Sequence, residues 1–475
     1  SNLRERLKLK EYASSKDLMA EGGNFKWLAE YKISHQKLES KRDEFDKKLI
    51  KLNEKFEVLQ GIFAWQYMRI IPKVNDKNNT WFIPMDMELL KIDTLSSITS
   101  LKYLSAIDKG AKNNDFIEAE SLLTEICAFQ LKIGKKVVPS ENQVNIEVSY
   151  NKMEIFKNTY RSYGLIGFLM LILFFVQLFI DPKSKTLKLF KILRIIFFFL
   201  LTVFFVYHGI GLGFRWVISD HAPWSNGYEA IIFIAWVTMI AGFSFTRKNI
   251  VILAGTAILA SLMIFVTELS LFDPEITPLV PVLKSYWLKI HVAIITGSYG
   301  FLGLAAILGL LNLILYTVRN EKNKEIVTIN INELTYVSEM TMTIGLFMLT
   351  IGTFLGGIWA NESWGRYWGW DPKETWALVS VLVYAVILHL RFIPKLNGKF
   401  LFNVMSFWGY SAILFTFFGV NFMLVGLHSY ANGDGLGKFP TWLSLTILFF
   451  VGFTAFASFR NKSLERKSKK DLLSE

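Results

Sequence analysis

The chain has 475 residues, of which 52% are hydrophobic and 15% aromatic, and its formal net charge is +12. Soluble proteins have about 45–50% apolar residues, so this composition argues against a wholly soluble protein. The basic residues lie mostly in short loops between apolar stretches. This pattern follows the positive-inside rule and excludes nucleic-acid binding as the reason for the charge. The single cysteine, Cys127, excludes a disulfide, a cysteine metal site and a CxxC redox pair within the chain. The apolar run around Cys127 predicts a small buried side chain.

The first part of the chain has the composition of an ordinary charged soluble region. Residues 30–60 combine Lys and Glu with apolar residues at mixed three- and four-residue spacing, which predicts a surface helix or helical hairpin with a solvated His35. Turn-forming residues fill 72–85, and two further helices are expected within 86–133. We therefore predict a mainly helical soluble domain at residues 1–160, whose simplest role is structural or partner-binding.

Nine apolar stretches follow, each close to the 20 or so residues that a helix needs to cross a bilayer. They lie near 163–180, 191–213, 228–245, 249–269, 291–317, 339–358, 374–391, 403–427 and 440–457. The fold class that this pattern predicts is an all-α polytopic membrane protein with about nine transmembrane helices. The transmembrane domain would occupy residues 161–457, and a basic tail would follow at 458–475.

Alternate loops of this predicted bundle differ in charge. One set, together with the C-terminal tail, holds 19 Lys and Arg residues, whereas the opposite loops hold six. The first set is therefore predicted to be cytoplasmic, which places residues 1–160 on the outer side. The chain begins at Ser1 rather than Met and shows no signal peptide, which is compatible with a fragment of a longer protein.

The predicted outer loop after the sixth span is rich in tryptophan. Within residues 359–376 the chain has Trp359, Trp364, Trp368, Trp370 and Trp376. An interfacial aromatic belt explains one or two tryptophans at a helix end, but it explains poorly a set that alternates with glycines. Glycines let the backbone approach a flat partner, and aromatic planes offer a stacking surface for a large apolar ring system.

The end of the same loop has a local structural explanation. Asp371 is a good N-cap residue, Pro372 suits the first helical position, and Glu374 stands three residues after the cap. This capping-box pattern predicts that the seventh span begins here.

The pattern Trp364-Gly365-x-x-Trp368-x-Trp370-Asp371-Pro372-x-Glu374 resembles the WWD signature of heme-handling membrane proteins. That family includes the CcsA (ResC) subunits of System II cytochrome c synthases, which also occur as two-module CcsBA proteins, and the related CcmC and CcmF proteins. The resemblance covers roughly residues 160–457. It implies a heme site at the outer face, formed by the tryptophans and Asp371.

Five of the six histidines lie in or beside predicted spans. His291 begins the fifth span and His428 ends the eighth, so the topology places both on the outer side at the depth of the tryptophan loop. Two imidazoles can ligate one heme iron from opposite faces, and the resemblance implies this arrangement. The alternative is a pair of interfacial histidines that bond to loop carbonyls.

His389 lies towards the inner side of the seventh span, about 22 Å along the helix from Glu374. An ionisable residue inside a membrane indicates function by default, and the alternative is a histidine that reaches the interface. In CcsBA synthases, a histidine here binds heme in transit with a partner from the upstream module. Arg215 is a candidate partner for a heme propionate, because guanidinium suits carboxylates. For His208 and His221, which bracket the stretch containing Arg215, structural hydrogen bonding is the simplest role.

The resemblance implies a holocytochrome c synthase in a bacterial inner membrane, with the soluble domain and heme site periplasmic and the C-terminus cytoplasmic. Heme b, as substrate and bound ligand, would sit between His291 and His428 and accept the thiols of Cys-x-x-Cys-His in apocytochrome c. The catalytic candidates are His291, His428 and Asp371. A CcsB/ResB-like module or a missing N-terminal segment would supply the partner of His389, and thiol-reducing proteins would keep the substrate reduced. Two alternatives are a heme exporter or delivery protein that presents heme to a separate synthase, and a heme-free scaffold or solute transporter.

Overall fold

The structure, a computed structural model, describes residues 18–19, 25–37, 42–63, 65–84, 86, 94–180, 186–246, 249–269, 271–279, 283–424, 426 and 441–472. The chain forms two compact units, Ser1–Ser140 and Glu141–Glu475. The division falls before the predicted boundary at residue 160 because helix α8 (Glu141–Met153) packs with the second unit. There, the Tyr207 hydroxyl donates to the Met153 carbonyl at 3.0 Å. The placement of the first unit outside a membrane stays a prediction.

The first unit is a set of short helices and one small hairpin. Its described elements are α3 (Leu28–Gln36), α4 (Glu44–Phe63), β1 (Ile71–Pro72), β2 (Trp81–Phe82), α6 (Thr94–Asn113) and α7 (Ile117–Ile133). Helices α3 and α4 form the helical hairpin that the sequence allowed, and they pack around a fully buried Trp27. Helices α6 and α7 occupy the stretch where two helices were expected. The antiparallel pairing of β1 with β2, which joins Ile71 to Phe82, was not anticipated.

The predicted burial of Cys127 is wrong. Cys127 is exposed on α7, whereas its neighbour Ile126 is buried. Successive residues of an α-helix point about 100° apart, so one helix face cannot bury every member of a continuous apolar run. His35 is exposed on α3, as expected.

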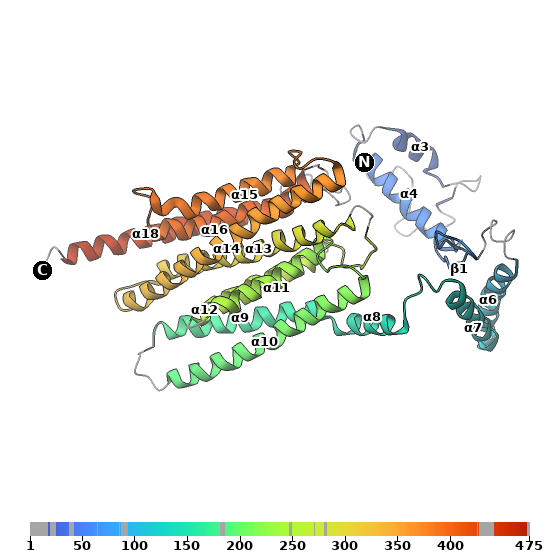
Figure 1. Ribbon diagram of the computed structural model, residues 1–475, viewed down its shortest axis with the longest axis horizontal. Helices are drawn as coiled ribbons and strands as arrows, with labels where there is room; N and C mark the ends of the chain where they lie inside the picture. Colours follow the sequence, from blue (N-terminus) through green and yellow to red (C-terminus); the bar gives the residue numbers. More distant parts are fainter. Residues whose placement is uncertain are drawn as a thin grey trace. The chain divides into compact units, whose positions relative to one another are not determined.

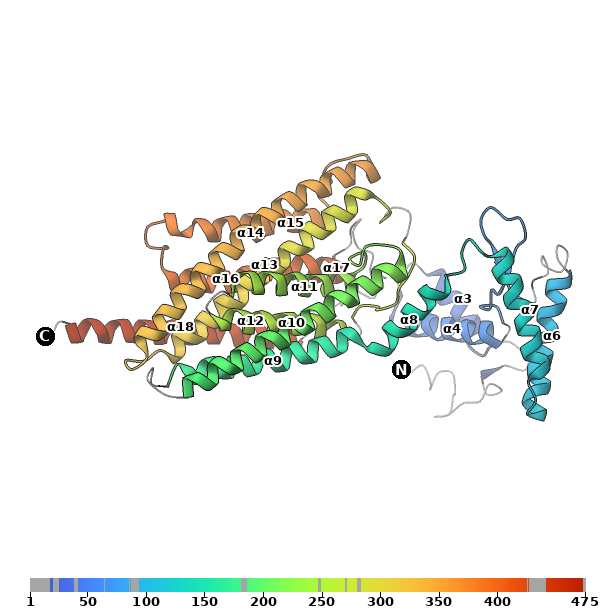
Figure 2. The same cartoon turned by 60° about the horizontal axis from the view of Figure 1, so that its bottom comes forward.

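The second unit is a bundle of long helices, which run side by side in Figures 1 and 2. They are α9 (Ile155–Gln177), α10 (Thr186–Ser219), α11 (Gly227–Phe245), α12 (Ile250–Thr267), α13 (Tyr286–Val318), α14 (Lys324–Trp364), α15 (Pro372–His389), α16 (Lys399–Leu414) and α18 (Thr441–Leu472). Shorter pieces are the 3₁₀ turn η3 (Leu390–Phe392), the π-helix η4 (Phe415–Gly419) and α17 (Val420–Met423). Among the described residues, nine helical segments are long and apolar enough to cross a membrane. The predicted fold class, an all-α polytopic membrane protein, is therefore confirmed.

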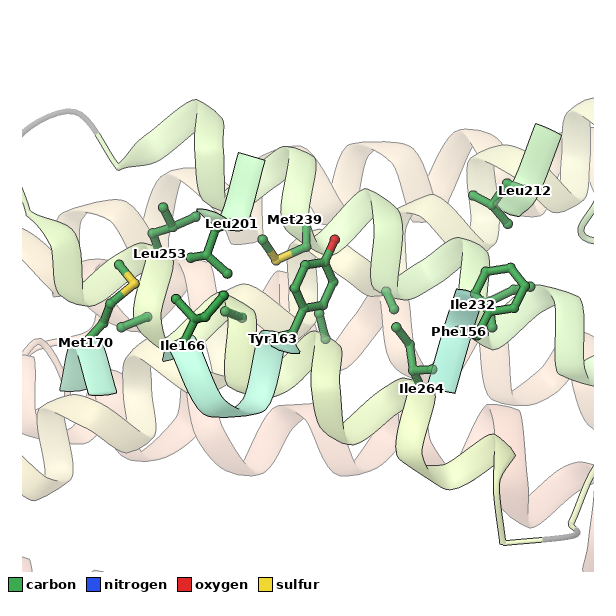
Figure 3. Packing of buried hydrophobic residues seen from close by; sticks show 14 of the residues in the cluster. Phe156, Tyr163, Ile166, Met170, Leu201, Leu212, Ile232, Met239, Leu253 and Ile264 are labelled. Carbon is green, nitrogen blue, oxygen red and sulfur yellow. The ribbon is translucent and has the colours of Figure 1, made fainter. Parts of the chain in front are cut away.

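The helices differ in how far they enter the protein interior. In the most apolar stretches of α11, α12 and α13, 67% of residues are buried, against 6% in α10 and α18. The first group forms the centre of the bundle, and the apolar surfaces of α10 and α18 suit contact with lipid. Figure 3 shows Tyr163 of α9 among Leu201, Met239 and Leu253, which come from α10, α11 and α12.

Small residues bring α13 and α14 close together. At Gly352 of α14, an added Cβ would lie 2.9 Å from the Cβ of Ile295 on α13. Close backbone approach at small residues is a main source of helix association in membranes, because lipid removes the hydrophobic drive between helices. This contact fixes α14 against the start of α13, where His291 lies.

A buried polar cluster joins the same helices to α16. The Asn312 amide donates to Asn403 Oδ1 at 2.6 Å and to Thr335 Oγ1 at 3.1 Å, and the Asn403 amide donates to Thr335 Oγ1 at 2.8 Å. Interhelical hydrogen bonds of this kind stabilise membrane bundles by roughly 0.6 kcal/mol each. The cluster therefore helps to hold α13, α14 and α16 together, further along α13 than His291.

Candidate functional site: an aromatic cavity at one end of the bundle

The start of α15 is fixed by the predicted capping box. Asp371 Oδ2 accepts from the Lys373 backbone N–H at 3.1 Å, and Glu374 Oε2 accepts from the N–H groups of Gly369 at 2.7 Å and Asp371 at 3.3 Å. Asp371 is buried, and a Cβ on Gly426 would lie 2.5 Å from its Oδ1. The chain just beyond α17 therefore passes beside this cap.

Four of the five tryptophans of residues 359–376 form two separate ring pairs, and the fifth, Trp376, lies 4.1 Å from the ring of Phe415. Helix α14 continues through Trp364, so Trp359 and Trp364 are helical; their rings meet edge to face at 4.8 Å, and Trp359 is buried. Trp368 and Trp370 lie beyond the helix in a second edge-to-face pair at 5.8 Å. Trp368 is half-buried, whereas Trp370 is 70% exposed.

One glycine between the tryptophans lies directly against a side chain of the same loop. The guanidinium of Arg366 fills the position that a Cβ on Gly369 would occupy. The backbone N–H of Gly369 donates to Glu374 Oε2 at 2.7 Å. The backbone of Gly369 therefore joins the loop to the cap, and its missing side chain leaves room for Arg366, which is a local role that the sequence pattern did not reveal.

His291 lies in the first turns of α13 with its ring held by α14. Its Nδ1 is 2.7 Å from the Gly352 carbonyl oxygen. Because a carbonyl only accepts, Nδ1 donates, and in the neutral ring the lone pair then falls on Nε2. A Cβ on Gly356 would lie 2.6 Å from Cε1 of the ring, and Trp359 lies nearly parallel to it at 6.5 Å. The imidazole is thus oriented by a second-shell carbonyl, as in many metal-ligating histidines.

His291 opens onto a cavity of about 880 Å³. Its walls come from residues 221–230, the loop 271–279, the start of α13, the end of α14, residues 367–377, and η4 with α17. This volume is within the usual range for small-molecule sites, about 300–1,000 Å³, and the walls are mostly apolar and aromatic. A π-helix such as η4 is uncommon and frequently occurs at functional sites.

The cavity contains some of the predicted residues and not others. His291 and Trp368 line it, but Trp364, Trp370, Asp371, Arg215 and His389 are not among the residues that form its described walls. The lining also includes His221, Trp359, Tyr367 and Lys373, none of which the sequence analysis assigned to the heme site, although it named His221 and Trp359. Within the described residues, no group of three or more His, Cys, Asp or Glu side chains could hold a metal ion.

Arg215 is buried in a network of its own. Its guanidinium donates to Glu229 Oε1 at 3.0 and 3.2 Å, to the Tyr150 hydroxyl at 3.2 Å and to the Pro274 carbonyl at 3.0 Å. Arg215 and Glu229 are 1% and 0% exposed. Glu229 Oε2 also accepts from the Ser225 N–H at 2.9 Å. The pair therefore supports two cavity walls, residues 221–230 and 271–279, from behind. The propionate contact predicted for Arg215 stays a prediction.

The remaining histidines lie apart from His291, except for His221. His221 lines the cavity with Nδ1 3.2 Å from the Ala222 carbonyl and Nε2 3.4 Å from the Thr277 carbonyl. His389 is exposed at the end of α15, with Nδ1 2.7 Å from the Ala385 carbonyl. His208 is buried beside the rings of Phe156 and Tyr163. His428, the predicted second iron ligand, lies outside the described residues.

Comparisons with known proteins bear on this part of the chain. The family described as "Cytochrome C assembly protein" matches residues 224–428, which include most of the cavity walls. The chain is 38% identical over 424 residues to "Protein NrfI" of Wolinella succinogenes, covering 88% of this chain but only 46% of that protein. It therefore spans about half the length of that relative.

Two shorter relatives are covered over most of their length. The chain is 35% identical over 242 residues to "Cytochrome c biogenesis protein CcsA" of Guillardia theta, and 35% identical over 251 residues to the CcsA of Prochlorococcus marinus. These alignments cover 80% and 79% of the relatives and 46% of this chain. The nine candidate spans, the tryptophan motif and these likenesses agree, and the chain belongs to the CcsA-type family of cytochrome c assembly proteins, which act in cytochrome c biogenesis.

Proposed function

We propose that this chain binds heme b as a substrate in the aromatic cavity and attaches it covalently to apocytochrome c. The observation that carries the proposal is a half-buried His291, with its lone pair directed to Nε2, in the wall of an aromatic cavity of about 880 Å³. Porphyrin is a large apolar ring that needs stacking surface and one or two axial ligands from the protein. The cavity supplies both kinds of group.

His428 is proposed as the second iron ligand. It stands two residues after Gly426, which lies against the Asp371 cap, and the cap in turn adjoins Lys373 and Glu374 of the cavity wall. In this account Asp371 shapes the site by starting α15, and Trp368 contributes ring surface. Trp364 and Trp370 are proposed to act around the cavity rather than within it.

The attachment reaction is an addition. Each thiol of the Cys-x-x-Cys-His segment adds across one heme vinyl group; a carbon–sulfur bond forms, and the thiol proton moves to the other vinyl carbon, so no oxidant or reductant is consumed. The protein then has to hold heme and segment in reacting geometry and control the iron ligands, which are entropic and positioning roles. No nucleophile of its own is required.

Several finer features belong to the same proposal. We place the chain in a bacterial inner membrane, with the cavity on the periplasmic side and the C-terminus in the cytoplasm. His389 would bind heme in transit, completed by a CcsB/ResB-like module or an upstream segment, and its exposed position suits a partner from another module. Separate thiol-reducing proteins would keep the apocytochrome cysteines reduced.

A heme exporter or delivery protein would use the same cavity, and the exposed His389 at the far end of α15 also suits a heme route through the bundle. Co-expression with an apocytochrome carrying Cys-x-x-Cys-His separates the two functions. A synthase yields heme that stays on the apocytochrome through denaturing electrophoresis. Heme that loads onto this chain but never becomes linked would support delivery instead.

Absorption spectroscopy of the purified chain tests heme binding at the cavity. We expect His291→Ala to lose the b-type heme spectrum and added imidazole to restore it, and we expect the same of His428→Ala. His221→Ala is the matched control, because it lines the same cavity with both ring nitrogens near backbone carbonyls; it should keep the wild-type spectrum. Unchanged heme content and spectrum in His291→Ala would refute the site.

A further inference from the structure

Lys373 belongs to the described wall of the cavity, together with its aromatic residues. Lys373 is half-buried at the start of α15, and its Nζ donates to Asn421 Oδ1 of α17 at 3.1 Å. An ammonium group has three donors, and this contact uses one. Removing such a cation from water is costly unless an anion or further acceptors compensate it.

The nearest carboxylates in sequence are already used by the protein backbone. Asp371 accepts from the N–H of Lys373 itself, and Glu374 accepts from the N–H groups of Gly369 and Asp371. Among the residues that the structure describes, no carboxylate lies within 4.0 Å of Lys373 Nζ. The charge on Lys373 is therefore offset by the neutral Asn421 amide and by more distant groups.

The other cations near the cavity are placed differently. Lys289 also lines it but is exposed at the rim. Arg215 is neutralised by Glu229 behind the wall. Of the two lysines in the described cavity wall, Lys373 is thus the less exposed one, so it can meet an anionic group of a molecule inside the cavity where a charge-assisted hydrogen bond is strongest.

We propose that Lys373, held by Asn421, binds a carboxylate of the tetrapyrrole and so sets which way round heme enters the cavity. This inference rests on the proposed function, because it names the group that receives one propionate. Lys373 is a residue that the sequence motif contains but that its pattern did not single out, and the propionate contact predicted for Arg215 stays a prediction.

The test compares two ligands that differ only at the carboxylates. Detergent-solubilised full chain, freed of heme, is titrated with ferric heme b and with its dimethyl ester, and binding is followed by the Soret absorption. A charge-assisted hydrogen bond corresponds to a preference of about 10- to 100-fold for the free acid in the wild-type chain. Lys373→Met should reduce that preference to about one while ester affinity changes by less than about threefold.

Matched variants make the result specific. Lys373→Arg should keep a preference, and Lys289→Met should keep the full wild-type preference, because it removes an exposed rim cation. Lys373→Gln replaces the methionine variant if the latter does not fold. Equal wild-type affinity for acid and ester, a preference that survives Lys373→Met or Lys373→Gln, or a preference lost in Lys289→Met would each overturn the proposal. Failure of the wild-type chain to bind either heme is a different result, and it contradicts the proposed function itself.

Discussion

Two polar regions adjoin the same cavity walls and are satisfied in opposite ways. Behind the wall, Arg215 and Glu229 are withdrawn from solvent and pair with each other, and Arg215 also donates to the Tyr150 hydroxyl and the Pro274 carbonyl. On the inner side, His291 and Lys373 are half-buried and line a space large enough for a ligand. A charged residue near a site therefore need not take part in the chemistry of that site. Arg215 and Glu229 pair with each other and support the cavity walls, whereas His291 and Lys373 belong to the lining of the cavity itself.

The largest expected effect comes from removing one charge of the buried Arg215–Glu229 pair. Glu229→Leu leaves the Arg215 cation buried without its partner, which costs about 3–5 kcal/mol in comparable cases. We expect little folded protein by fluorescence-detected size exclusion, and a lower melting temperature for what remains. The double variant Arg215→Met with Glu229→Leu should recover most of the loss, because both charges are gone. A single variant that melts like the wild type would show that the pair is not structural.

The next largest effect is expected from a larger side chain beside His291 in the cavity wall. Gly356→Leu places side-chain atoms where the His291 ring lies, since even a Cβ would approach Cε1 to 2.6 Å. Overpacking typically costs about 1–3 kcal/mol, and here the displaced group is the proposed ligand, so heme content should be lost while the bundle still folds. Gly452→Leu on α18 is the control, because a Cβ there meets nothing within 4 Å. Normal heme binding by Gly356→Leu would argue against His291 as ligand.

A smaller effect should separate the two tryptophans of the motif. Trp368 lines the cavity, whereas Trp370 is 70% exposed and is not among the residues of the described walls. Losing one aromatic contact surface corresponds to about a tenfold weaker heme affinity for Trp368→Ala, and Trp370→Ala should change it less than about threefold. Equal losses in a heme titration would mean that the motif acts as one unit.

The smallest effect concerns a satisfied polar group in the first unit. Hydrogen bonds from Lys37 and then Ser34 lower the pKa of Asp46 from 3.8 to about 2. Because the folded-state pKa is the lower one, this stabilisation is present above pH 3.8 and is lost as the pH falls through about 2. Backbone amides of α3 and α4 in the full chain should therefore be better protected from hydrogen exchange in the wild type than in Asp46→Asn at pH 5. The difference in protection should disappear near pH 2. A difference in protection that persists at pH 2 would show that ionised Asp46 is not its cause.

Local signals explain why so much of the fold was predictable. A span needs only a long apolar run, and the α15 start needs only Asp371, Pro372 and Glu374 in order, so both follow from neighbouring residues. The hairpin of β1 and β2 was missed because its stability comes from pairing across a turn, between strands of two residues each. The prediction that Cys127 is buried was wrong because composition does not show which face of a helix packs against the protein.

The site was only partly predictable for a related reason. His291 and Trp368 stand in recognisable sequence contexts, but a cavity is made by distant segments. Nothing in the sequence states that Lys373 faces it or that Arg215 meets Glu229 and Pro274. The two cations look equally suited to a carboxylate in sequence, and their difference is a matter of tertiary contacts.

A cryo-electron microscopy structure of the full chain loaded with heme would test directly whether the cavity is the heme site. We expect porphyrin density inside the cavity, with the iron bound by His291 Nε2, a ring face against Trp368 and a propionate at Lys373. Porphyrin density found elsewhere, with lipid or solvent in the cavity, would contradict it.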